Sequence, residues 1–159
     1  MIYHKLIKPL LFSFDPETAH DLGSKTLQLI SKSRPACKLL RKFLLSTNDP
    51  VEILGLKFPN RIGQAAGLDK NGLFPTASEA IGFGFIEVGT VTPLSQPGND
   101  QPRLFRFPKE LALVNRMGFN NNGVEALRNK ISKTFPKVRR HVPLDRKSTR
   151  LNSSHQIIS

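Results

Sequence analysis

A run of small residues followed by a charged pair is the stretch of this sequence best suited to holding a flat ligand. It reads Ile62-Gly63-Gln64-Ala65-Ala66-Gly67-Leu68-Asp69-Lys70. The apolar start predicts a buried strand, and the small residues leave backbone N–H and C=O groups open to a planar molecule. Lys70 adds a cation at the rim. We therefore predict a strand that ends in a ligand-binding loop.

Two further segments carry groups that could complete such a site. Residues 84–93 repeat the pattern, since an apolar run ends there in small and hydroxylic residues. Residues 115–121 place amides beside a guanidinium; amides read planar donor and acceptor patterns, and arginine reads carboxylates. A helical pattern over residues 73–81 separates the two strand-to-loop units. This order predicts a parallel βαβ arrangement, in which ligands bind at the carboxyl ends of the strands.

Length and composition limit the architecture. The chain has 159 residues, which suits one domain but is too short for an eight-unit barrel of about 250 residues. Its hydrophobic content of 38% is low for a well-packed domain and predicts that part of the chain does not fold. Cys37 is the only cysteine, which excludes an internal disulfide and a cysteine metal cluster. We expect no metal site.

The formal charge of +12 is concentrated at the two ends. Residues 1–48 hold eight Lys and Arg against three acids, residues 49–135 hold ten against eight, and residues 136–159 hold six against one. A strong positive charge is typical of nucleic-acid-binding proteins, but no helix-turn-helix, zinc-finger or RNP motif accompanies it. We therefore expect no nucleic acid as a partner, and a basic nucleic-acid binder stays as an alternative.

The first helices can be located from their start signals. Pro9 would kink or divide any helix in the apolar first 14 residues. Asp15 as N-cap and Pro16 at the first helical position predict a helix that runs to about Ser31.

A third helix is predicted after Pro35, with apolar and basic residues on opposite sides. Its apolar side is formed by Leu39, Leu40, Phe43 and Leu44, and its basic side by Lys38, Arg41 and Lys42. An amphipathic helix with a cationic rim can lie flat on an anionic membrane. The alternative is that the apolar stripe docks on the rest of the protein and leaves the basic residues in water.

The remaining elements follow from local patterns. Residues 51–58 alternate around Gly55 and predict a strand or tight hairpin. Residues 93–114 contain four prolines and predict a long loop. Residues 123–135 carry apolar residues at helical spacing and predict a helix.

Five motifs, in order and spacing, resemble the N-terminal part of the quinone-dependent class of dihydroorotate dehydrogenases. They are Ala65 to Lys70, Glu87 to Pro93, Gln96 to Asn99, Pro102 to Arg106 and Asn115 to Asn120. The resemblance runs from about residue 1 to about residue 135. It implies an α/β fold, namely an incomplete TIM (β/α)8 barrel made of its first two βα units and preceded by a small N-terminal helical domain.

The resemblance also implies a division of the chain. Residues 1–48 would form the helical domain that associates with the membrane and encloses a quinone tunnel, and residues 49–135 the first part of the FMN-binding barrel. Residues 136–159 are rich in charge and hydroxyls, which is the signature of a segment that cannot bury a core. We therefore predict a non-native or disordered tail there.

In the family, the cofactor is FMN and the substrate is dihydroorotate, which becomes orotate. The resemblance implies FMN contacts at Ala66, Gly67, Leu68, Asp69, Lys70 and Thr90, and substrate contacts at Lys70, Asn115, Arg116, Met117, Gly118 and Phe119. The backbone at Ala66 and Gly67 would supply donors to the flavin, and Lys70 a cation. The alternative is that the glycines are ordinary turn residues and Lys70 is solvated.

His20 and Arg106 are the implied quinone-site residues. His20 lies in Asp15-Pro16-Glu17-Thr18-Ala19-His20, which is similar to a helical segment that lines the family's quinone tunnel. Without the resemblance, His20 would be an ordinary surface or core residue. Arg106 would point toward the tunnel, and its alternative is a salt bridge to Glu110 or Glu87.

The resemblance implies FMN-dependent oxidation of dihydroorotate coupled to quinone reduction, a step of pyrimidine biosynthesis, in a full-length parent. The catalytic base would lie beyond these residues, so we expect this chain to be a truncated, inactive piece. Its expected location is the cytoplasmic face of the inner (cell) membrane, as a peripheral protein. The alternative is a non-catalytic basic fragment that binds a membrane surface or nucleic acid.

Overall fold

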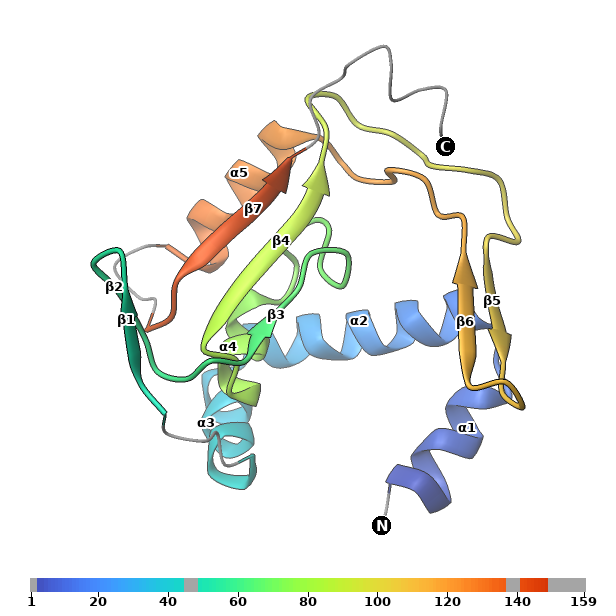
Figure 1. The fold of residues 1–159 in the computed structure, drawn as a ribbon, viewed down its shortest axis with the longest axis horizontal. Coiled ribbons are helices and arrows are strands. Elements are labelled where there is room, and N and C mark those ends of the chain that lie inside the picture. The colour runs from blue at the N-terminus through green and yellow to red at the C-terminus, as the bar shows by residue number, and fades with distance from the viewer. Residues whose placement is uncertain (1–2, 45–48, 137–140, 149–159) are drawn as a thin grey trace.

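The computed structural model describes residues 3–44, 49–136 and 141–148. Figure 1 shows a small parallel sheet with helices on one side and a separate hairpin, β5–β6, that stands beside the N-terminal helices. Among the described helices, none is long and apolar enough to cross a bilayer.

The N-terminal part is helical, as the sequence predicts. It contains a π-helical turn, η1 (Tyr3–Ile7), followed by α1 (Lys8–Phe12), α2 (Pro16–Lys32) and α3 (Arg34–Phe43). The Asp15 carboxylate caps α2 by accepting the backbone N–H groups of Glu17 and Thr18 at 3.1 and 3.0 Å. The predicted start of α2 is therefore confirmed, and its cap is the reason that the helix begins at Pro16.

The central sheet has three parallel strands in the order β3 (Gly63–Gln64), β4 (Phe85–Val91) and β7 (Leu144–Ser148). Helix α4 (Pro75–Ile81) connects β3 to β4, and α5 (Val124–Thr134) precedes β7. The predicted parallel βαβ unit is confirmed. The sheet does not close into a barrel within the residues that the structure describes.

Strand β4 places its alternate residues on two different faces. Ile86 and Val88 are 0% and 1% exposed, and they pack with Leu127 of α5 in the apolar core. Phe85 and Glu87, which alternate with these two residues along the strand, are only partly buried. This alternation directs aliphatic side chains toward the helices and leaves the other face to the loops at the strand ends.

The predicted first helix and strand of the βαβ unit are both shorter than expected. The helix predicted over residues 73–81 begins at Pro75, because the buried Asp69 carboxylate accepts the N–H groups of Leu73 and Phe74 at 2.8 and 2.9 Å and so holds these two residues in a turn. The predicted first strand has only two residues, and Ile62 is 60% exposed.

The long loop predicted over residues 93–114 is wrong for its second half. Residues 104–115 form an antiparallel hairpin of β5 (Leu104–Phe107) and β6 (Ala112–Asn115). Its turn contains Leu111 at a φ of 52°, and this leucine is 90% exposed. Pro108 ends β5 and obscures the alternation in the sequence. The other hairpin, β1 (Val51–Ile53) with β2 (Leu56–Phe58), is confirmed.

The predicted disordered tail, residues 136–159, needs correction over residues 142–148. Leu144 to Ser148 pair with β4 in parallel, and Val142, 6% exposed, joins the core. Only two of the side chains in this segment are apolar, but parallel pairing needs backbone groups rather than a long aliphatic run. Residues 137–140 and 149–159, which the tail prediction also covers, lie outside the described residues.

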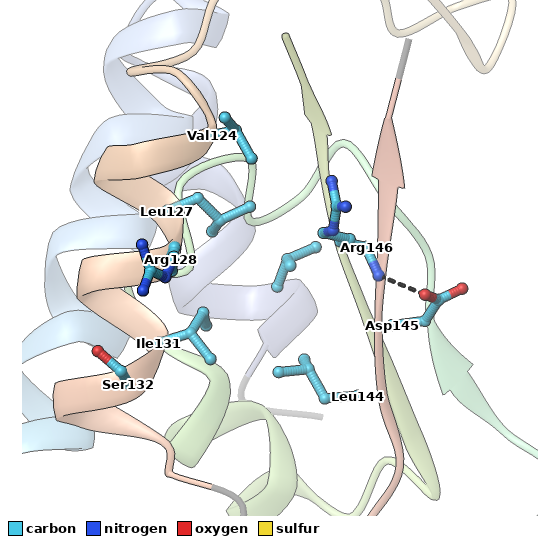
Figure 2. A pocket seen from close by; sticks show the side chains of 9 residues that line it. Val124, Leu127, Arg128, Ile131, Ser132, Leu144, Asp145 and Arg146 are labelled. Carbon is cyan, nitrogen blue, oxygen red and sulfur yellow. Dashed lines mark hydrogen bonds between the residues drawn. The ribbon is translucent and has the colours of Figure 1, made fainter. Parts of the chain in front are cut away.

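An apolar groove runs between α5 and β7. It has a volume of about 520 Å³, and Figure 2 shows Leu127 and Ile131 of α5 facing Leu144 of β7 across it, with Arg128 and Arg146 at its edges. None of the residues that we predict to bind a ligand lines this groove.

Replacing Ile86 tests the packing of β4 on α5. We expect Ile86→Ala to lower the free energy of unfolding by about 2–5 kcal/mol, because it removes a fully buried side chain and leaves a cavity. Leu94, which is 75% exposed, provides the control, and Leu94→Ala should change the free energy by less than about 0.5 kcal/mol. Urea unfolding of the two variants measures both values; equal losses would contradict the assigned core.

Candidate functional site

A cleft of about 690 Å³ lies where α2, the loop after β3 and the ends of β5 and β6 meet. We call it the Lys70 cleft. Its lining includes Gly67, Leu68, Asp69, Lys70, Asn115, Met117 and His20, all of which the sequence analysis singled out. Because these residues come from three distant parts of the chain, the fold brings most of the predicted site into one cavity.

Lys70 is the half-buried cation of this cleft. Its ammonium group donates a hydrogen bond to the Asn120 side-chain oxygen. Burial lowers the pKa of Lys70 below its usual value; the Arg103 cation lowers it further, and the Glu17 carboxylate opposes the shift. The alternative that Lys70 is simply solvated is therefore wrong. A desolvated ammonium with an amide partner can bind a carboxylate strongly.

The segment from Asn115 to Phe119 is only partly turned toward the cleft. Asn115 and Met117 line it. Arg116 instead donates to the Pro102 carbonyl at 3.0 and 3.3 Å, and its guanidinium lies 6.0 Å from the centre of the Phe105 ring. Gly118 and Phe119 are exposed and do not line the cleft.

The predicted flavin donors are largely engaged within the protein. The Ala66 N–H donates to the Glu87 carboxylate at 3.2 Å, and the Gly67 N–H donates to the Gly89 carbonyl at 2.6 Å. Ala66 and Thr90 do not line the Lys70 cleft. The prediction that the N–H groups of Ala66 and Gly67 are open to a ligand is therefore wrong. These two groups instead join the loop after β3 to β4.

The Asp69 carboxylate accepts hydrogen bonds from the backbone of the turn that follows it. Its two oxygens accept the N–H groups of Leu73 and Phe74, and the side chain is 1% exposed. Burial raises the pKa of Asp69, while these backbone donors lower it. The carboxylate thus fixes the turn that carries Lys70.

His20 and Arg106 line two different cavities. His20, half-buried on α2, faces the Lys70 cleft. Arg106 lines a second cavity of about 380 Å³ between α1 and the β5–β6 hairpin. Its guanidinium donates to the carbonyls of Leu11 and Phe14 at 3.3 and 3.1 Å and lies 4.6 Å from the centre of the Phe12 ring.

The structure shows other partners for Arg106 than the two acids considered from the sequence. Among the ion pairs between described residues, Arg106 makes none with Glu110 or Glu87. The carbonyls at the end of α1 occupy its donors instead. The two predicted quinone-site residues therefore do not share one cavity, and their roles stay predictions.

Sequence analysis missed three residues that build the cleft. Asn120 pairs with Lys70, and Glu17 on α2 binds Arg103 through both carboxylate oxygens at 2.7 to 3.3 Å. Glu17 and Arg103 are 86 positions apart, and no local pattern indicates such a pair. Arg103 does lie in one of the motifs that carry the family resemblance.

Asn121, one of the amides in the segment 115–121, is 3% exposed and joins three segments. Its side-chain oxygen accepts the N–H groups of Thr92 and Gly123 at 3.2 and 2.8 Å, and its amide nitrogen donates to the Phe119 carbonyl at 2.5 Å. Asn121 therefore fixes the chain between Phe119 and α5 against the end of β4.

The Lys70 cleft can bind a planar polar ring that carries a negative charge. It combines one desolvated ammonium with the amides of Asn115, Asn120 and Gln101 and the apolar side chains of Leu104 and Leu113. Gly67, at a φ of 103°, has open space where a side chain would lie, which leaves room beside the loop. Among the residues that the structure describes, no cluster of acids, His and Cys could hold a metal ion.

Comparison with known proteins gives the family of this chain. The family model for dihydroorotate dehydrogenase matches residues 50–154. The chain belongs to the dihydroorotate dehydrogenase family. The match extends beyond residue 135, where the resemblance in the sequence was expected to end.

Two relatives of similar sequence are both named dihydroorotate dehydrogenase (quinone). The chain is 54% identical over 134 residues to dihydroorotate dehydrogenase (quinone) of Methylococcus capsulatus, with 84% of this chain and 38% of the relative covered. It is 48% identical over 148 residues to the protein of the same name from Albidiferax ferrireducens, with 92% and 41% covered. The chain therefore spans about two fifths of the length of these relatives.

A solved structure supports the same family assignment. The crystal structure of dihydroorotate dehydrogenase from Eimeria tenella in complex with ferulenol matches with a TM-score of 0.62 and 36% identity. The match covers 83% of this chain and 35% of that protein.

Replacing Asn121 tests whether its buried hydrogen bonds stabilise the fold. We expect Asn121→Ala to lower the free energy of unfolding by about 2–4 kcal/mol, because buried groups of Thr92, Phe119 and Gly123 lose their partners. The neighbouring Asn122 has an exposed side chain, so Asn122→Ala is the matched control and should cost under about 0.5 kcal/mol. Chemical denaturation distinguishes them; an equal effect at both positions would rule out this role for Asn121.

Proposed function

We propose that this chain supplies part of the site for FMN-dependent oxidation of dihydroorotate to orotate coupled to quinone reduction. The activity is that of a protein in which these residues are joined to the rest of a TIM (β/α)8 barrel, of which β3, α4, β4 and α5 would be the first two units. The observation that carries the proposal is the convergence of Lys70 and Asn115 in one cleft of a chain that belongs to this family.

Dihydroorotate is a cyclic amide that carries a carboxylate, and each part has a partner in the Lys70 cleft. The Lys70 ammonium would pair with the carboxylate, since a partly desolvated cation holds an anion more strongly than an exposed one does. The amides of Asn115 and Asn120 would bind the ring N–H and C=O groups. Substrate would then replace Lys70 as the partner of Asn120.

The residues around Gly67 fit a flavin in part. FMN, when bound, accepts a hydride from the substrate and passes electrons to the quinone. Gly67, Leu68 and Lys70 form the wall of the cleft along which its ring would lie, whereas Ala66 and Thr90 would hold it only through contacts outside this cleft. Lys70 would also offset negative charge on a reduced flavin.

We propose that the chain by itself does not catalyse the reaction. It supplies one wall of the flavin site, and the predicted donors at Ala66 and Gly67 are already bonded within the protein. The division into a helical part, residues 1–48, and a barrel part, residues 49–135, is consistent with the helices and the sheet seen here.

The proposed partner of residues 1–48 is the surface of the inner (cell) membrane on its cytoplasmic face, from which quinone would enter. Support comes from α3, where Leu39 and Phe43 are 57% and 72% exposed beside Lys38 and Lys42. The alternative is that this apolar stripe docks on the protein; Leu40 of the stripe is half-buried, whereas Leu39 and Phe43 are exposed, and Arg41 pairs with Glu79 of α4. An exposed apolar stripe with a cationic rim favours an anionic lipid surface.

Orotate binding tests the role of Lys70. We expect the chain to bind orotate, and Lys70→Gln to weaken the affinity by about tenfold or more, because a charge-assisted contact is lost. Lys57, exposed on β2, gives the control Lys57→Gln, which should bind as the parent does. Calorimetric or NMR titration measures both.

Two results would argue against this proposal. Orotate affinity that is the same in Lys70→Gln and in the parent would remove Lys70 from the site. Dihydroorotate oxidation by this chain with FMN and a soluble quinone, above the rate with free FMN, would contradict the proposed lack of catalysis.

Lipid binding tests the role of α3. In sedimentation with vesicles that contain phosphatidylglycerol, the double substitution of Leu39 and Phe43 by Ser should reduce the bound fraction about tenfold or more, because two apolar side chains no longer enter the bilayer. Leu94→Ser, at an exposed site outside the helices, should leave binding unchanged. Equal vesicle-bound fractions of the parent, the double variant and Leu94→Ser would exclude α3 as the contact.

A further inference from the structure

We propose that the ion pair between Glu17 and Arg103 is a positioning device that makes α2 a fixed wall of the Lys70 cleft. Glu17 belongs to the first turn of α2, and Arg103 immediately precedes β5. The pair thus joins the helical part of the chain to the segment from which the opposite wall is built. Neither residue is among those that we assign to the cofactor, the substrate or the quinone.

All three guanidinium nitrogens of Arg103 donate hydrogen bonds within the protein. Its Nε and Nη2 atoms donate to Glu17 at 3.0 and 2.7 Å, and its Nη1 atom donates to the carbonyls of Pro97 and Asn99 at 2.9 and 2.8 Å. A planar fork is suited to this task because it can hold a carboxylate and two carbonyls at once. Lysine at this position could not make the same set of contacts.

The loop that Arg103 holds is in turn bonded to the wall that carries Asn115 and Met117. The Arg116 N–H donates to the Arg103 carbonyl at 2.8 Å, and the Asn99 N–H donates to the Met117 carbonyl at 3.1 Å. Gly98 lies so close that a side-chain carbon there would be 2.3 Å from the Met117 carbonyl oxygen. A displacement of Arg103 would therefore be transmitted to this wall.

Burial separates this pair from an ordinary surface ion pair. The side chains of Arg103 and Glu17 are 12% and 13% exposed, whereas those of Arg61 and Asp49, which also form an ion pair, are 68% and 56% exposed. The Arg103 guanidinium holds the pKa of Glu17 below its usual value. Exposed pairs contribute little, but loss of one partner from a buried pair leaves an uncompensated charge.

The pair also decides which cation the cleft offers. Since the charge of Arg103 is paired with Glu17 and its Nη1 donates to two carbonyls, Lys70 is, among the described lining residues, the cation without a carboxylate partner that the cleft offers to an anionic ligand. This consequence rests on the proposed function; the positioning role does not. Arg103 and Glu17 both line the cleft, so the pair lies close enough to affect the charge on Lys70.

Two readouts on the 159-residue chain test the proposal without flavin or orotate. The first is hydrogen exchange at the amides of Asn99 and Arg116, which should become about tenfold faster or more in Arg103→Gln and in Glu17→Gln, because the loop is released. The double variant should exchange no faster than Arg103→Gln, since both changes remove one interaction. Arg61→Gln is the matched control and should exchange as the parent does.

The second readout is the pKa of Lys70, measured by NMR titration of its side chain. Arg103→Gln should raise it toward its usual value, because the neighbouring cation that helps to lower it is removed. In the first readout, hydrogen exchange at Asn99 and Arg116, Arg103→Lys should give an intermediate rate, since lysine keeps the charge but lacks the planar guanidinium.

Unchanged exchange at Asn99 and Arg116 in both single variants, additive effects in the double variant, or an unchanged Lys70 pKa in Arg103→Gln would each overturn the proposal. If Arg103→Gln did not fold, Glu17→Gln would decide alone, because it keeps the contacts of Arg103 with the two carbonyls. Failure of orotate to bind would refute the proposed substrate site and leave these results unaffected.

Discussion

Parallel pairing of β4 on both of its edges is the constraint on which the rest of the structure depends. β3 and β7 flank this strand, and its Ile86 and Val88 side chains pack against α5. Because parallel strands point the same way, the loops that follow β3 and β4 emerge at one end of the sheet. The Gly67 N–H bond to the Gly89 carbonyl joins the loop after β3 to β4, and Asn121 attaches the start of α5 to Thr92, which follows β4.

The Lys70 cleft forms between this sheet end and two elements that lie outside the sheet. Figure 1 shows α2 running beneath the sheet toward the β5–β6 hairpin, and the cleft lies where these elements meet. The sheet positions Lys70 through the buried Asp69 turn, the hairpin positions Asn115, and α2 contributes Glu17 and His20. The site is therefore a junction, and its geometry depends on how helix and hairpin are joined.

The elements that could be predicted are those whose signals are local. Asp15 and Pro16 mark the start of α2, Gly55 marks a hairpin, and the two strand-to-loop units are parallel, all as expected. The β5–β6 hairpin and β7 were missed, since Arg106 and Pro108 interrupt the first pattern and the charged residues of 144–148 hide the second. Asn121 lies in a run of asparagines typical of turns, and this local pattern gives no sign of its burial.

The sequence by itself determined the family, the parallel order of the first strands and the choice of Lys70, Asn115 and His20 as residues of interest, because motifs and local propensities are carried by neighbouring residues. Only the tertiary structure decided that these three share a cleft, that Arg106 lies in another cavity, and that Ala66 and Gly67 have partners within the protein. Such contacts join residues that are 86 positions apart, as Glu17 and Arg103 show, and 95 positions apart, as Leu11 and Arg106 show. Their formation depends on how the elements pack, and no spacing along the chain records it.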